Sequence, residues 1–160
     1  MSVAHPAQKV KRTEEELSRI VRASFSPAET PPPIEAERAV LGAVLQYPPA
    51  IPEVRAILDT VEQPFQVGQH GELWRAVCAL HDAGKPVNYA TVSEYLRVHG
   101  GPLSPTATQV AGILDYHASF TAGPHYARDV AAAARAREAE HIAELAAACL
   151  RNGDTAAAAA

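Results

Sequence analysis

The chain has 160 residues, of which 48% are apolar and 33 are alanine. A length near about 150 residues predicts a single domain, and the alanine excess leaves a small, helix-packed core. With 14 basic against 18 acidic residues, the net charge of −4 excludes a general phosphate-neutralising surface of the kind that nonspecific DNA binding needs.

The sequence contains neither of two features that would place the protein in or across a membrane. No stretch approaches the roughly 18 apolar residues of a membrane span, and residues 1–24 lack the hydrophobic run of a signal peptide. We therefore expect a soluble, cytoplasmic protein. Cys78 and Cys149 lie in apolar helical patterns, which favours reduced thiols over a disulfide framework.

Residues 1–33 are expected to form a flexible arm. Thr13 with Glu16 three positions later predicts a short helix that ends near Ser24, and the proline-rich residues 26–33 predict a strap that cannot continue it. Five Lys and Arg against three Glu give residues 1–22 a charge of +2. Such a run is either a solvated arm or a weak contact for phosphate or an acidic partner.

Residues 34–103 show repeated helical periodicity and predict a small bundle of four helices. The expected helices cover residues 34–46, a segment from Pro52 to Pro64, residues 70–83 with Gly84 as C-cap, and a segment that begins near Thr91 and ends at residue 100. No segment has the pattern of a strand, so the predicted class is all-α.

Gly42 lies in the middle of the first of these helices. A glycine there costs about 1 kcal/mol relative to alanine. The close approach of another helix is the compensation that we expect.

Residues 104–152 predict a long antiparallel helical hairpin that follows the bundle. Its first arm is expected to begin at Ser104 and Pro105, and its second arm to run from Pro124 to about Leu150, some 40 Å at 1.5 Å per residue. The alanine-rich second arm would allow close packing of one arm on the other. Residues 153–160 lack side chains that could anchor them and are expected to be a disordered tail.

The sequence offers no catalytic, cofactor or metal site. Gly84-Lys85 is followed by Pro86 rather than Ser or Thr, so it does not match a nucleotide-binding loop. Glu138 and His141 have the spacing of a di-iron ligand pair, but the chain has no second such pair. We therefore expect no enzyme activity, no cofactor and no metal.

Several motifs resemble the N-terminal domain of DnaB-type replicative helicases over about residues 31–152. The segment Pro32 to Leu45, P-P-I-E-A-E-R-A-V-L-G-A-V-L, is similar to that family's P-x-S-I-E-A-E-Q-A-V-L-G-A-L-L opening. Residues 83–88, A-G-K-P-V-N, resemble its G-x-P-V-D motif, and residues 125–130, H-Y-A-R-D-V, its I-x-x-Y-A-x-I-V-R segment. The matching structural positions are Ile34, Glu35, Glu37, Val40, Leu41, Gly42, Phe65, His70, Gly84, Pro86 and Val87.

The resemblance implies a protein-association module in DNA replication. In that family the domain is a helical bundle with a hairpin that pairs between subunits, forms the collar of a hexameric ring and docks primase. The expected partners are the chain itself, primase and full-length replicative helicase, with DNA contacted only indirectly. This chain has no ATPase motor or Walker motif, so the helicase activity itself is not expected.

A hairpin longer than its bundle would leave apolar side chains without partners in the chain, and such surface marks an interface. Packing of one hairpin arm on the other is the equally weighted alternative. The candidate interface residues are Val110, Ile113, Tyr116, His117, Tyr126, Val130, Ile142 and Leu145.

Two other functions remain open from the sequence. A free-standing regulator could use the same fold to bind and cap a replicative helicase. A small helical DNA-binding protein could use the basic N-terminal arm, and its DNA affinity would then fall steeply with salt.

Overall fold

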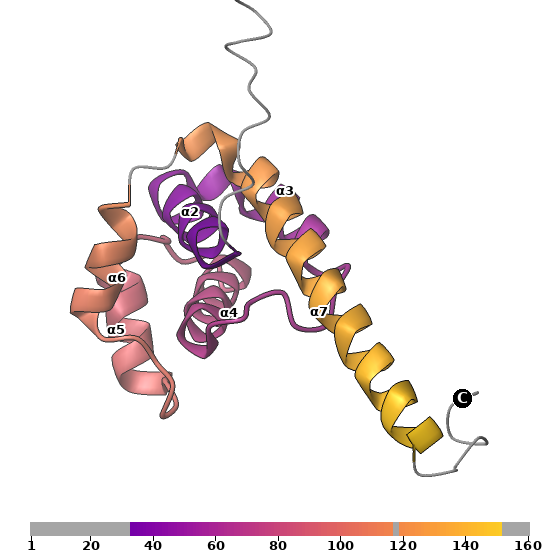
Figure 1. Cartoon of the computed structure of the whole chain (residues 1–160). Coiled ribbons are helices and arrows are strands. Elements are labelled where there is room, and N and C mark those ends of the chain that lie inside the picture. The colour runs from indigo at the N-terminus through magenta and orange to yellow at the C-terminus, as the bar shows by residue number, and fades with distance from the viewer. Residues whose placement is uncertain (1–32, 117–118, 152–160) are drawn as a thin grey trace, which may run out of the picture. The chain divides into compact units, whose positions relative to one another are not determined.

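The computed structural model describes residues 33–116 and 119–151. The expected all-α class is confirmed: in these two ranges every regular element is a helix (Figure 1). The expected N-terminal arm, apart from Pro33, and the expected tail lie outside the described residues. The elements in chain order are α2 (Pro33–Gln46), η1 (Pro48–Ala50), α3 (Ile51–Leu58), α4 (Gly68–Asp82), α5 (Tyr89–His99), α6 (Ala107–Leu114), η2 (Phe120–Ala122) and α7 (Gly123–Arg151).

Helix α2 is the centre of the core. Nine of its residues are buried, and α7, α6 and α4 all pack against it. Four of the nine buried residues are the small residues Ala36, Ala39, Gly42 and Ala43, and small side chains let neighbouring helices approach closely. Three of the chain's 33 alanines therefore allow close packing around this one helix.

Gly42 meets the close approach that the sequence predicted. A Cβ built at this position would lie 3.0 Å from the carbonyl oxygen of Ile113 in α6. Because that oxygen belongs to the backbone, it cannot move aside as a flexible side chain could. The cost of glycine in this helix is thus offset by the packing of α6 against α2.

The expected hairpin is not formed by packing of one arm on the other. Helix α6 has only 8 residues and packs against α2 and α5, whereas α7 has 29 residues and packs against α2 and α3. Helix α6 ends at Leu114, where Asp115 is the C-cap. The apolar residues of α6, Val110 and Ile113, are buried in the core instead.

Helix α7 is long, as predicted, and its two halves differ. In the first half, Ala127, Val130, Ala131 and Ala134 are buried against the other helices at helical spacing. Beyond residue 137 all residues up to Leu145 are exposed. Figure 1 shows this second half continuing past the other helices. We call residues 138–151 the α7 extension.

Two helix starts differ from the predicted ones. Helix α5 begins at Tyr89 rather than near Thr91, and its capping box is made by Asn88 and Thr91. Helix α6 is capped by Thr106 with Gln109 rather than by Ser104. In both cases another polar residue in the same short segment fulfils the cap, because Asn and Thr accept hydrogen bonds from backbone N–H groups as well as Ser does.

The C-terminus of α4 is as predicted. Gly84 has φ +65°, a left-handed conformation that glycine adopts without steric cost. The backbone N–H of Lys85 then donates to the carbonyl of Leu80 at 2.9 Å. None of the described helices is both long enough and apolar enough to cross a membrane.

Candidate association surface

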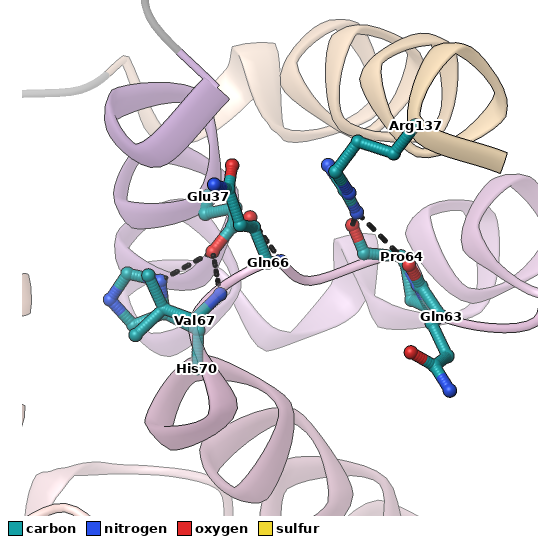
Figure 2. Close-up of polar contacts among 7 residues, drawn as sticks. All are labelled: Glu37, Gln63, Pro64, Gln66, Val67, His70 and Arg137. Atoms are coloured by element: carbon teal, nitrogen blue, oxygen red, sulfur yellow. Dashed lines mark hydrogen bonds and ion pairs between the residues drawn. The ribbon is translucent and has the colours of Figure 1, made fainter. Parts of the chain in front are cut away.

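A buried carboxylate joins α2 to the start of α4. Glu37 is only 1% exposed, and it accepts hydrogen bonds from the backbone N–H groups of Gln66 at 2.6 Å and Val67 at 3.3 Å. Its second oxygen also lies 2.7 Å from Nδ1 of the buried His70 (Figure 2). These contacts satisfy a carboxylate that would otherwise be costly to bury. They fix the loop before α4 against α2.

Helix α7 holds the same loop from the other side. The Arg137 guanidinium donates to the backbone carbonyls of Gln63 at 3.1 Å and Pro64 at 3.0 Å, as Figure 2 shows. Two residues earlier, Arg135 donates to Oγ1 of Thr60 at 2.7 Å. The loop between α3 and α4 is therefore clamped between α2 and α7. This clamp fixes the point from which the α7 extension begins.

A cleft of about 520 Å³ lies between this loop and α7. Its walls combine apolar side chains with charged ones of both signs. The lining residues are Val61, Glu62, Gln63, Phe65, Gln66, Ala134, Arg137, Glu138, His141 and Ile142. A volume in this range is typical of binding pockets, and here one wall is the exposed start of the extension.

The α7 extension carries an apolar stripe without a partner in the described part of the chain. Ile142 is 59% exposed and Leu145 is 52% exposed. Together with Glu138 and Cys149, they follow the i, i+4, i+7 and i+11 spacing of one helix face. An exposed apolar stripe on a protruding helix is the kind of surface that a protein partner covers.

The predicted interface residues fall into four groups. Val110, Ile113 and Val130 are buried within the chain, so they present no surface to a partner. Tyr116 and Tyr126 are half-buried, and Tyr126 packs against the core. His117 lies outside the described residues. Only Ile142 and Leu145 belong to a large exposed apolar stripe.

Most of the positions that match the family's motifs are buried. Val40, Leu41, Gly42 and Val87 are buried, as are the polar pair Glu37 and His70. Phe65 is half-buried, and its ring lies 6.3 Å from that of Trp74. The exposed members of the set are Ile34, Glu35, Gly84 and Pro86.

The histidine, cysteine and acidic side chains of the described residues bear on possible metal and thiol chemistry. No group of three or more His, Cys, Asp or Glu residues in residues 33–116 and 119–151 could hold a metal ion. Both cysteines are free thiols. Burial raises the pKa of the Cys78 thiol to about 11, which is the opposite of what an activated nucleophile needs.

Sequence reasoning missed the two contacts that shape this surface, although one of them left a signal. Glu37 lies one turn before Val40 and Leu41, on the apolar side of a predicted helix. A carboxylate at such a position requires polar partners. Nothing in the sequence indicated that Arg137 would reach the carbonyls of Gln63 and Pro64.

The fold and this surface together define a small all-α domain with an exposed apolar stripe on a protruding helix. Residues 29–132 match the DnaB-like helicase N terminal domain, and the chain belongs to this family. A solved N-terminal domain of DnaB helicase from Mycobacterium tuberculosis has the same fold, with a TM-score of 0.64 and 23% identity over 71% of this chain and 82% of that one.

Two curated relatives are full helicases. The replicative DNA helicase DnaB of Rhodothermus marinus is 36% identical over 102 residues, which are 58% of this chain and 11% of that protein. The DnaB of Nostoc sp. is 38% identical over 66 residues, which are 41% of this chain and 7% of that protein. The matched segment thus spans about a tenth or less of these relatives.

Proposed function

We propose that this domain is a protein-association module in DNA replication and that it self-associates through the α7 extension. The observation that carries this proposal is the stripe of Ile142 and Leu145, which protrudes from a domain whose other large apolar side chains are mostly buried. The family match favours this role over DNA binding by the N-terminal arm. In this role the domain supplies a binding surface and takes no part in catalysis.

The continuity of helix α7 supports this role. Helix α7 is continuous from Gly123 to Arg151, and Arg137 ties its middle to the loop before α4. Because the helix is already formed, the extension loses little conformational entropy when a partner binds the stripe. Primase or a full-length replicative helicase as a further partner, and a cytoplasmic location, belong to this proposal as well.

Light scattering on the 160-residue chain at increasing concentration tests self-association. We expect the wild type to form dimers or larger assemblies. Ile142→Asp should weaken association at least about 100-fold, because it removes an apolar contact and buries a carboxylate at the interface. Circular dichroism should show an unchanged helix content, since Ile142 makes no core contact.

Leu103→Asp is the matched control. Leu103 is 57% exposed, close to the value for Ile142, but it lies in the loop before α6. The same substitution there should leave the assembly unchanged. A wild type that stays monomeric at high concentration, and that binds neither primase nor helicase in a pull-down, would contradict the proposal.

A further inference from the structure

The stripe on the α7 extension has the same spacing when it is read from either end. Its members Glu138, Ile142, Leu145 and Cys149 are separated by four, three and four residues. The midpoint of the stripe lies halfway between Ile142 and Leu145. Two such helices that lie antiparallel, related by a two-fold axis at this midpoint, therefore place each member of one stripe opposite a member of the other.

The stripe begins at the cleft of about 520 Å³ between α7 and the loop before α4. Glu138 and Ile142 belong to the lining of this cleft, and Arg137 fixes the loop that forms its other wall (Figure 2). Toward the start of α7 the same face of the helix is covered, because Val130 and Ala134 are buried. A helix that lies along the stripe can therefore reach the cleft but cannot pass it.

We propose that two copies pair their α7 extensions antiparallel about this midpoint, and that the cleft of each copy receives the end of the other copy's α7. In this register Ile142 lies opposite Leu145 of the second copy, and Glu138 lies opposite Cys149. The inference rests on the proposed self-association. It agrees with the pairing between subunits that the family resemblance implies, and it adds the register and the occupant of the cleft.

The length of α7 fits this register. Cys149 and Glu138 each lie about 8 Å from the midpoint at 1.5 Å per residue. Helix α7 ends at Arg151, about 11 Å from the midpoint, so the end of the second helix lies opposite residue 136. The buried half of α7 ends at Ala134. The second helix thus fills the level of the cleft and ends before it meets the covered part of α7.

The extension and its base carry balanced charges. The basic residues Arg135, Arg137 and Arg151 equal in number the acidic residues Glu138, Glu140 and Glu144. The basic residues lie at the two ends of this segment, and the acidic ones lie between them. At about 100° per residue, Glu140 and Glu144 fall on the side of the helix away from the stripe. Glu138 is therefore the one carboxylate of the three on the paired face.

These charges favour antiparallel over parallel pairing. Parallel pairing would set Glu138 beside Glu138 and Arg151 beside Arg151, which is unfavourable. Antiparallel pairing brings the Arg151 end of one helix to the cleft of the other copy, whose acidic lining residues are Glu62 and Glu138. Arg137 also lines this cleft, but its guanidinium donates to two backbone carbonyls of the loop. With His141 counted as neutral, the cleft has a net charge of −1, opposite to that of Arg151.

Disulfide cross-linking tests the register, because a disulfide needs two Cα atoms within about 7 Å of each other. Every variant carries Cys78→Ser, so that Cys149 is the one native cysteine left. In the antiparallel pair the two copies of Cys149 lie about 16 Å apart along the helix axis. We therefore expect no intermolecular disulfide when Cys78→Ser alone is treated with diamide.

A second variant moves the thiol to the other end of the stripe by combining Cys78→Ser with Glu138→Cys and Cys149→Ser. Its two thiols are equally far apart in a dimer, so this variant alone should not cross-link either. An equimolar mixture of the two variants should give a disulfide-linked dimer on a non-reducing gel, because position 138 of one copy lies opposite Cys149 of the other. Leu103→Cys in place of Glu138→Cys is the control at an exposed position in another loop, and its mixture should stay uncross-linked.

Filling the cleft gives a second measurement. Gln66 is exposed and lines the cleft, so Gln66→Trp would occupy the space of the incoming helix end. We expect this variant to associate about tenfold more weakly, or weaker still, in sedimentation velocity. Lys85→Trp is the control, because Lys85 is exposed and lies outside the cleft; it should associate as the wild type does.

The other outcomes separate this inference from the proposed self-association. Cross-linking of each variant alone but not of the mixture would show parallel pairing and overturn the register. A wild type that associates while neither the variants nor their mixture cross-link would also overturn it, and self-association would stand. Wild-type affinity in Gln66→Trp would overturn the occupancy of the cleft. A wild type that stays monomeric would overturn both proposals.

Discussion

Replacement of Glu37 by glutamine tests whether the buried carboxylate holds α2, α4 and the intervening loop together. The side-chain shape is kept, but one oxygen becomes an NH₂ group. The remaining oxygen can still accept the short bond from Gln66, and His70 can change tautomer so that Nδ1 accepts. The N–H of Val67 then faces a donor and loses its partner.

The magnitude follows from these three contacts. Hydrogen bonds to a charged group contribute about 1 kcal/mol more than neutral ones, and an orphaned buried N–H costs about 1–3 kcal/mol. We therefore expect Glu37→Gln to lower the free energy of unfolding by about 3 kcal/mol. For a domain of roughly 120 residues this is a decrease in Tm of about 12 °C.

Urea denaturation followed by far-UV circular dichroism measures this change. Glu35→Gln is the control, because Glu35 lies in the same helix and is exposed; it should change stability by less than about 0.5 kcal/mol. A double-mutant cycle with His70→Asn should give a coupling energy of about 0.5–3 kcal/mol. A Glu37→Gln protein as stable as the control would refute the structural role of the cluster.

Two further predictions concern residues in the helices. Gly42→Ala should destabilise the fold by about 1 kcal/mol, because crowding against the Ile113 carbonyl at 3.0 Å exceeds the gain in helix propensity. Gly112→Ala, where an added Cβ meets nothing within 4 Å, should stabilise it by about 0.5–1 kcal/mol; equal signs in urea denaturation would contradict this packing. Burial raises the pKa of Cys78 to about 11, so about 0.1% of it is thiolate at pH 8. Iodoacetamide labelling of Cys78 should thus rise about tenfold per pH unit up to pH 10, measured by mass spectrometry against Cys78→Ser. Labelling at pH 8 as fast as that of a free cysteine would show that the thiol is not buried as described.

The sequence predicted the positions of the helices better than it predicted which helices pack against each other. Periodicity located the α2 and α4 cores, and Gly84 marked the end of α4 correctly. The capping residues were predicted less accurately, because each helix start has two polar residues that could cap it. The structure uses Asn88 rather than the nearby Thr91, and Thr106 rather than Ser104. Local patterns specify that a helix starts in a short segment, but the tertiary packing selects which polar residue caps it.

The arrangement of α6 and α7 could not be predicted from local pattern. The alanines of α7 indicated close packing against another helix, and the structure shows α2 and α3 as the partners. Small residues permit a close approach without specifying which helix approaches. The same limit applies to the surface: the pattern singled out Ile142 and Leu145 together with Val110 and Val130, and only the fold separates the exposed pair from the buried one.

The most direct test of the proposed association is the mass of the chain in solution. Sedimentation equilibrium over a wide concentration range should show a mass that rises above the 17.0 kDa of a single chain to that of a dimer or a larger assembly. Ile142→Asp should return it to the monomer under the same conditions. A wild type that remains at the monomer mass up to millimolar concentration, or an Ile142→Asp protein that assembles as well as the wild type, would contradict self-association through the α7 extension.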